Sequence, residues 1–143
     1  MPAGQREAPK GFQQLLQQAN RLQDVFMAEF REGMTGNELL AKILQTARAK
    51  GIPQPKVYSH NLGHLLHEPG PLIGLPWQQE RCPGRGDVKL VYDSCFAMEL
   101  CVTDIVPEWD NQEFRLSVEQ DVAFTRQDGC RPLDDRQIRF HLV

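Results

Sequence analysis

Residues 95–125 read CFAMELCVTDIVPEWDNQEFRLSVEQDVAFT, and this stretch decides the fold. Two runs rich in β-branched and aromatic residues, 95–106 and 114–125, flank the turn-forming segment PEWDNQ. Runs of this kind on either side of a short polar turn predict antiparallel strands. Residues 88–92 and 137–143 form two further strand-like runs, and RQDGCR predicts another turn. The second half of the chain is therefore expected to form an antiparallel sheet.

Upstream of this stretch, apolar residues recur at three- and four-residue steps, a spacing typical of amphipathic helices. The first stripe predicts a helix over residues 12–32, with Gly33 at its carboxyl-terminal cap. Thr35 and Glu38 match the capping-box pattern at the start of a second helix, which Gly51 and Pro53 end. The fold class is α+β, with two helices followed by an antiparallel sheet.

The composition indicates one ordinary globular domain over residues 1–143, with a flexible start at residues 1–11. The 16 Lys and Arg against 19 Asp and Glu give a net charge of −3, and the basic residues are not clustered, so no nucleic acid is expected as a partner. No membrane association is expected either, because no run approaches the roughly 20 apolar residues of a span. The polar start lacks a secretory signal, and we expect a cytoplasmic protein. The four cysteines form no CxxC pair, so structural roles are expected for them.

Three of the four histidines fall within eight residues, at His60, His64 and His67. On a regular strand, His60 and His64 share a face while His67 points to the other, but a bend at Gly63 would bring His60 and His67 together. Neutral imidazole is a ligand for zinc, manganese and cobalt, and it also serves as acid or base near neutral pH. The alternative is that these histidines only satisfy backbone hydrogen bonds.

Two carboxylates interrupt the strand-like runs. Glu99 lies in the apolar segment FAMEL and Glu119 within LSVEQDV. A buried carboxylate is normally paired, hydrogen-bonded or bound to a metal. The structural alternatives are a salt bridge from Glu99 to Arg115 or Lys89, and a solvated strand face for Glu119. The Pro- and Gly-rich segment 68–87 has no hydrophobic period and is expected to be a long functional loop.

The order of these residues resembles the second half of the pita-bread metallopeptidases. That family includes methionine aminopeptidase, aminopeptidase P and prolidase, with the metal-free creatinase as a relative. Its pattern has a ligand histidine, a glycine three residues later and a second histidine at seven, as in His60, Gly63 and His67. An apolar strand with a ligand glutamate follows, as at Glu99, and then a bridging glutamate in a strand that runs to a threonine, as at Glu119. The helix pair before the histidines also belongs to that fold.

The resemblance implies roles for four residues. His60, Glu99 and Glu119 would be metal ligands for a divalent ion such as manganese, cobalt or zinc, and His67 would be the catalytic residue that binds the substrate carbonyl. His64 has no counterpart and is expected either beside the ligands, without contacting the metal, or at the surface. The implied function is metal-dependent aminopeptidase-type hydrolysis of a peptide substrate, in the manner of the Xaa-Pro peptidases.

The family's two aspartate ligands precede the first helix, whereas no aspartate stands upstream of Asp24 in this sequence. The chain is therefore expected to be an incomplete pita-bread domain, its carboxyl-terminal portion, and to be catalytically incomplete. The alternative is a non-catalytic binding module that takes a peptide ligand, and a third reading is creatinase-like chemistry that uses His67 alone. An uncovered sheet edge would also favour a homo-oligomer.

Overall fold

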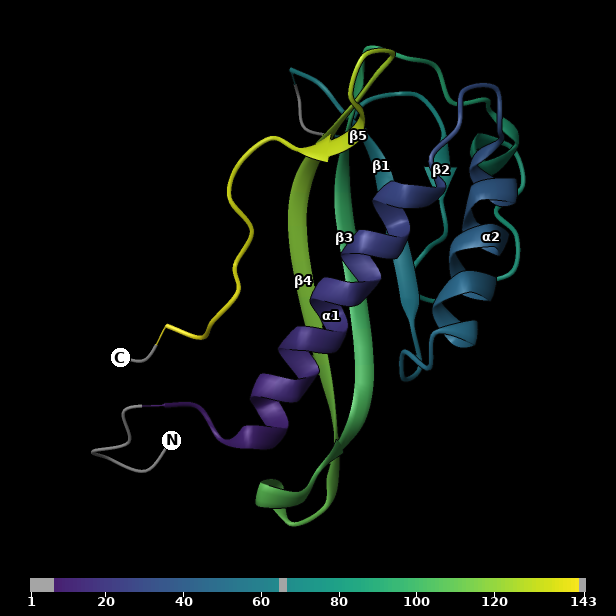
Figure 1. Cartoon of the computed structure of the whole chain (residues 1–143). Helices are drawn as coiled ribbons and strands as arrows, with labels where there is room; N and C mark the ends of the chain where they lie inside the picture. Colours follow the sequence, from purple (N-terminus) through teal and green to yellow (C-terminus); the bar gives the residue numbers. More distant parts are fainter. Residues whose placement is uncertain (1–6, 65–66, 142–143) are drawn as a thin grey trace.

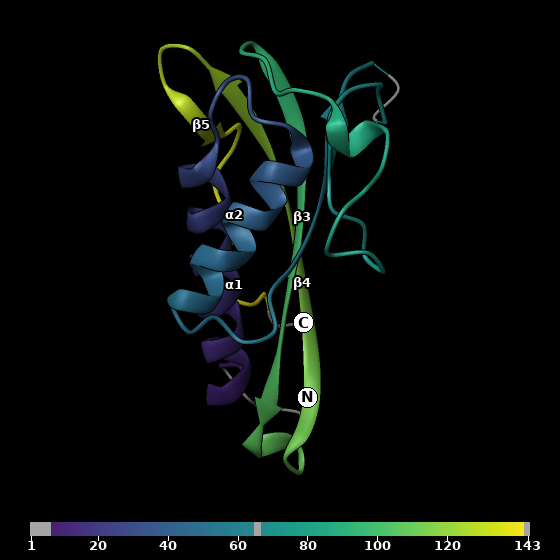
Figure 2. The same cartoon turned by 90° about the vertical axis from the view of Figure 1, so that its right-hand side faces the viewer.

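The computed structural model of the protein describes residues 7–64 and 67–141. Strands form one antiparallel sheet in the order β2-β1-β3-β4-β5, and both helices pack on the same face of it (Figures 1 and 2). The α+β architecture and the order of helices and sheet predicted from the sequence are confirmed. The elements are α1 Lys10–Glu29, α2 Gly36–Ala49, β1 Lys56–Leu62, β2 Leu72–Ile73, β3 Ser94–Val106, β4 Gln112–Thr125 and β5 Gly129–Pro132, with 3-10 turns at Arg85–Asp87 and Pro107–Trp109.

Helix α1 crosses the sheet and buries its apolar stripe against β3 (Figure 1). It begins at Lys10, inside the predicted flexible start, and it ends at Glu29, three residues before the predicted boundary. Residues 1–6 of that predicted start lie outside the described residues. Gly33 lies in the turn after the helix with a φ of 83°, and its N–H donates to the carbonyl of Leu90 rather than capping α1.

The predicted capping box starts α2. The Thr35 hydroxyl accepts from the N–H of Glu38 at 3.2 Å, and the Glu38 carboxylate accepts from the N–H of Thr35 at 2.7 Å. These two bonds satisfy helix donors that would otherwise lack partners. The α2 side chains that face the sheet are fully buried, among them Leu39, Leu40 and Ile43.

The predicted hairpin of residues 95–125 is the centre of the sheet. Strands β3 and β4 pair in register from Ser94 opposite Phe124 to Val106 opposite Gln112. Successive side chains of a strand point to opposite faces, so Phe96, Met98 and Leu100 enter the core beneath the helices. The residues between them form the opposite, polar face, which carries the candidate site.

Two predicted strands are wrong, for identifiable reasons, and one predicted turn is shorter than expected. Residues 88–92 are not a strand of the sheet, because their backbone bonds to the turn between the helices, through pairs such as Leu90 N–H to Met34 O at 2.7 Å. Residues 137–141 are not a strand, since Asn20 on α1 donates to the Gln137 carbonyl; residues 142–143 of this predicted run lie outside the described part. RQDGCR contains the start of β5, not only a turn.

The segment 68–87 is mostly loop, as predicted, and it contributes to the sheet through one side chain. The Gln79 amide accepts from the Val57 N–H at 2.8 Å and donates to the Val57 carbonyl at 2.7 Å. The Gln79 side chain thus makes the two backbone hydrogen bonds that a neighbouring strand would make with Val57. These bonds hold the loop beside the polar face of the sheet. In the described part of the chain, no helix is long and apolar enough to span a bilayer.

Candidate metal and peptide site

The polar face of the sheet places the predicted site residues in adjacent cross-strand rows. One row is Tyr58 on β1, Glu99 on β3 and Glu119 on β4, because Tyr58 pairs with Glu99 and Glu99 pairs with Glu119. The next row holds His60, which pairs with Ala97 two residues from Glu99. Since alternate residues share a face, the carboxylates and His60 all lie on the side away from the helices.

His60 and Glu99 are in direct contact. The imidazole is 3% exposed, and its Nε2 lies 3.3 Å from Oε1 of Glu99. Its Nδ1 lies 3.0 Å from the carbonyl oxygen of Asn61, which can only accept, so Nδ1 carries the proton. In the neutral imidazole, Nε2 then presents a lone pair to a carboxylate oxygen. Two acceptors at this distance require a proton or a cation between them.

The predicted bend at Gly63 is confirmed. Strand β1 ends at Leu62, and the N–H of Glu68 donates to the Asn61 carbonyl at 3.1 Å, which turns the chain back. The rings of His60 and His67 then stack with centroids 4.1 Å apart and planes 17° apart. A Cβ on residue 63 would lie 2.1 Å from Cγ of Glu68, so this close return favours glycine.

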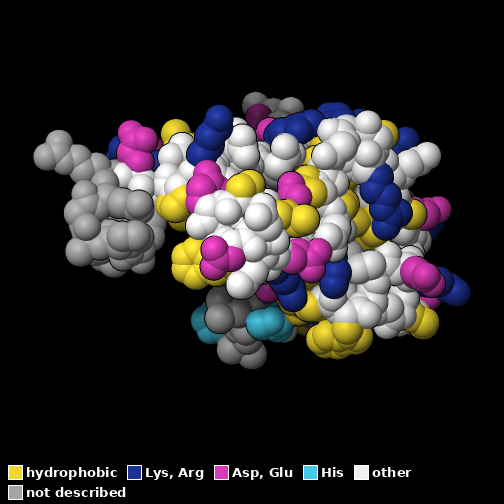
Figure 3. Space-filling model, turned by 90° about the horizontal axis from the view of Figure 1, so that it is seen from below, with side chains coloured by type: hydrophobic (Ala, Val, Ile, Leu, Met, Phe, Trp, Pro, Cys, Tyr) yellow, Lys and Arg dark blue, Asp and Glu magenta, His cyan; other side chains and the backbone are white. Residues whose placement is uncertain are grey.

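His67 and His64 differ in their surroundings. His67 is exposed yet stacked on the buried His60, whereas His64 lies exposed in the turn that follows Gly63, where the sequence placed it at the surface. Histidine side chains accordingly reach the surface at one edge of the face shown in Figure 3. The arrangement brings His67 to the rim of the His60–Glu99 pair.

Glu99 and Glu119 repel each other across the β3–β4 pair. Partial burial raises the pKa of Glu99 above its ordinary value, and the negative charge of Glu119 raises this pKa further, while His60 and His67 act in the opposite sense. The pKa of Tyr58 is also raised, mainly by burial and then by the charge of Glu99. This row therefore favours a bound proton or cation.

Replacing Glu99 with Gln is expected to stabilise the metal-free protein at pH 8 by up to about 1 kcal/mol, the range of cross-strand like-charge pairs. Because the pKa of Glu99 is raised in the folded state, its ionisation disfavours the folded state as the pH rises above the ordinary glutamate value. The gain should vanish near pH 4, where the carboxyl is protonated in both states. Urea unfolding at the two pH values measures it.

Two further variants show whether a gain in the stability of Glu99→Gln comes from charge repulsion, from burial or from neither. Glu119→Gln removes the repulsion but not the burial of Glu99, so its gain at pH 8 should be smaller. Glu80→Gln, at an exposed loop position, should change the free energy of unfolding at neither pH. A loss of stability in Glu99→Gln at pH 8 would contradict the interpretation of this row.

The donor types at the site fit a divalent ion, since an unprotonated imidazole nitrogen and a carboxylate oxygen converge at Nε2 of His60 and Oε1 of Glu99. Glu119 lies opposite Glu99 as a third candidate. Within residues 7–64 and 67–141, however, no group of three or more His, Cys, Asp or Glu side chains is arranged to hold a metal ion. Among the described residues, His60 and Glu99 are thus the two candidate ligands whose donor atoms lie in direct contact.

Of the two structural alternatives for the glutamates, the salt bridge from Glu99 to Arg115 or Lys89 is wrong, and the solvated strand face for Glu119 is confirmed. Glu99 pairs with His60, and neither Arg115 nor Lys89 is its partner. Arg115 instead donates from Nε to the Sγ of Cys101 at 3.2 Å. Glu119 is exposed, as expected of a solvated strand face.

Sequence reasoning missed three residues near the site. Tyr58 shares the row of the glutamates, and its two-residue spacing from His60 on a strand was the signal that could have identified it. Asp121 lies on the same face as Glu119, opposite Ala97. Arg85 donates to the carbonyls of Glu68 at 2.9 Å and Gly70 at 3.2 Å, which fixes the loop after His67, and no local pattern revealed it.

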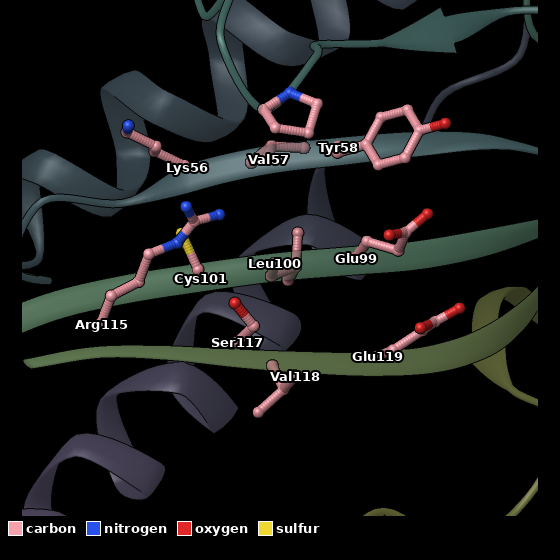
Figure 4. A pocket seen from close by; sticks show the side chains of 11 residues that line it. Lys56, Val57, Tyr58, Glu99, Leu100, Cys101, Arg115, Ser117, Val118 and Glu119 are labelled. Atoms are coloured by element: carbon pink, nitrogen blue, oxygen red, sulfur yellow. The ribbon is translucent and has the colours of Figure 1, made fainter.

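A cavity of about 200 Å³ opens beside this row, between β1, β3, β4 and the loop residue Pro76. Figure 4 shows its polar side chains at two ends of the same sheet face: Tyr58, Glu99 and Glu119 at one end, and Lys56, Cys101 and Arg115 at the other. The cavity thus has an anionic end and a cationic end.

Comparisons with known proteins agree with this architecture. The structure is similar to the X-Pro aminopeptidase from Thermotoga maritima MSB8, with a TM-score of 0.64 and 22% identity over 92% of this chain and 33% of that chain. The structure is also similar to dipeptidase PepE from Mycobacterium ulcerans, with a TM-score of 0.60 and 16% sequence identity. That match covers 93% of this chain and 32% of the dipeptidase. For methionine aminopeptidase from Rickettsia prowazekii, the TM-score is 0.54 and the sequence identity 17%. The match covers 83% of this chain and 50% of that protein.

The chain spans about a third of the length of the X-Pro aminopeptidase and the dipeptidase that it matches, so it corresponds to part of the pita-bread fold. Among curated proteins, none matches the sequence. The family model of Metallopeptidase family M24 matches residues 2–126, which include all the site residues described above. This chain belongs to Metallopeptidase family M24.

Proposed function

We propose that this chain is a metal-dependent, aminopeptidase-type hydrolase domain for peptides with an Xaa-Pro bond, with an incomplete metal site of its own. One observation carries the proposal: Nε2 of His60 and Oε1 of Glu99 face each other at 3.3 Å, while the other ring nitrogen, Nδ1, lies 3.0 Å from the Asn61 carbonyl oxygen. Membership of the M24 family and the similarity to an X-Pro aminopeptidase support the choice of reaction and substrate.

In this proposal His60 and Glu99 hold a divalent ion, manganese, cobalt or zinc, with Glu119 as a third ligand. A divalent ion held there polarises a peptide carbonyl and acidifies a water molecule. In this proposal His67 donates a hydrogen bond to the carbonyl oxygen of a bound peptide, which its exposure and its stacking on His60 support. Imidazole can hold or release that proton near neutral pH.

The proposal also covers the compartment, the oligomeric state and the kind of partner. All four cysteines, each at a described position, are unpaired, which is typical of a reducing compartment such as the cytoplasm. Strand β5 pairs with only residues 122–125 of β4, and the rest of this long strand offers an edge for association with a second copy. The mildly negative net charge supports a peptide rather than a nucleic acid as the partner.

Titration calorimetry with manganese and with cobalt tests the metal site. The wild-type protein is expected to bind one ion weakly, and His60→Ala and Glu99→Gln are each expected to weaken binding by at least about tenfold, the range for losing one ligand interaction. Binding should strengthen as the pH rises, because metal ligands bind an ion in their deprotonated form.

His64→Ala is the matched control, since His64 lies exposed in the neighbouring turn. It should bind the metal as the wild type does. Equal binding by wild type, His60→Ala and Glu99→Gln would overturn the proposed site, and no binding at millimolar metal would favour a non-catalytic peptide-binding module.

A further inference from the structure

The cationic end of the cavity is built on the strands next to the glutamate row. Lys56 on β1 pairs with Cys101 on β3, and Cys101 pairs with Ser117 on β4, so these three form the next row on the same face. Arg115 stands two residues beyond Ser117, and its bond to the Cys101 sulfur draws the guanidinium back over this row. Lys56 and Arg115 thus line the same cavity as the glutamates (Figure 4).

These two cations lack an anionic partner among the residues that the structure describes. Within the described ranges, neither Lys56 nor Arg115 forms an ion pair with a carboxylate, although five other ion pairs are present. The Nε of Arg115 is held by the Cys101 sulfur, so the terminal amino groups of the guanidinium remain to bind a planar anion in a bidentate manner. A pair of cations at the surface of this cavity, with one guanidinium held by the Cys101 sulfur, is suited to a carboxylate.

We propose that Lys56 and Arg115 form a carboxylate-binding subsite for a peptide whose scissile bond lies at the His60–Glu99 pair. The position relative to the scissile bond rests on the proposed function; the binding of a carboxylate does not. Two residues along a strand span about 7 Å, which separates the Cys101 row from the Glu99 row. An extended peptide covers the same distance in about two residues. The subsite therefore takes either the α-carboxylate of a tripeptide or an acidic side chain two residues after the scissile bond.

Binding of four tripeptides to the metal-free protein tests the subsite by calorimetry. Ala-Pro-Ala with a free carboxylate is compared with its amide, and Ala-Pro-Asp amide is compared with Ala-Pro-Asn amide. The wild type is expected to bind at least one carboxylate peptide about tenfold more tightly than its neutral counterpart, the size of a charge-assisted bidentate interaction. The pair that shows the preference identifies the source of the carboxylate.

Lys56→Gln and Arg115→Gln should each reduce this preference to below about threefold, and the double variant should abolish it. Lys42→Gln and Arg48→Gln remove the same charges at exposed positions on α2 and should leave the preference unchanged. Equal binding of acid and neutral peptides by the wild type, or a preference that survives in the double variant, would overturn the subsite.

The metal titration separates this proposal from the proposed function. If metal fails to bind at His60 and Glu99 while the carboxylate preference depends on Lys56 and Arg115, the subsite stands and the proposed function falls. If metal binds there and no peptide shows the preference, the proposed function stands and the subsite is wrong.

Discussion

Hydrolysis of Xaa-Pro peptides by this chain, supplied with manganese or cobalt, is expected to be absent or at least about 1,000-fold slower than that of a full-length X-Pro aminopeptidase. Oxyanion and metal-ion stabilisation together contribute several kcal/mol in such sites, and each 1.4 kcal/mol is tenfold in rate. In the part of the chain that the structure describes, no set of three metal-binding side chains is arranged around one point. Metal affinity depends on the number and geometry of the ligands, so an ion at His60 and Glu99 should be weakly held.

The assay compares release of the amino-terminal residue from Ala-Pro-Ala by the two proteins at equal concentration and saturating metal. A matched pair of variants identifies the source of any residual activity. His67→Ala should remove it, while His64→Ala should leave it unchanged. Turnover at ordinary enzymatic rates that is lost in His67→Ala would show that this chain assembles a complete site.

Phe96→Ala is expected to destabilise the protein by about 3–5 kcal/mol, which is a large share of the stability of a domain of this size. Phe96 is fully buried on β3, and its ring packs against that of Phe30, with centroids 5.3 Å apart. Phe30 in turn contacts Phe124 at the same centroid distance. The substitution opens a cavity where the turn after α1 meets the sheet.

Urea unfolding followed by circular dichroism measures this change. Trp77→Ala is the control, because Trp77 is an aromatic residue that is 80% exposed, and its loss should cost less than about 0.5 kcal/mol. A loss below about 1 kcal/mol in Phe96→Ala would mean that the packing between β3 and the residues after α1 contributes little to the stability.

Local pattern was sufficient for the elements whose partners lie nearby in the chain. The Thr35 and Glu38 box starts α2, and the two strands joined by PEWDNQ pair along their whole length, because both features depend on residues close together in sequence. Residues 88–92 have strand-like composition, but their backbone partners are Gly33, Met34 and Gly36, more than fifty residues upstream. Periodicity carries no information about such a distant partner.

The sequence indicated which residues are candidates for the site, but it did not indicate which of these side chains contact one another. The spacing of His60, Gly63 and His67 predicted a bend, and the bend stacks the two rings. Which carboxylate meets His60 depends on the register of β1 against β3, and this register also places Lys56 beside Cys101. A shift of two residues would keep these side chains on the same face but change their partners, so the alternation of apolar and polar residues could not decide the pairing.

The position of a bound ion is the most direct test of this account. Crystals of the protein soaked in cobalt and measured at the cobalt absorption edge would locate the ion by its anomalous scattering. One ion is expected at about 2.0–2.2 Å from Nε2 of His60 and from a carboxylate oxygen of Glu99, with the Nδ1 bond to Asn61 intact. An ion bound only elsewhere on the chain, with Nε2 of His60 still facing Glu99 directly, would contradict this expectation.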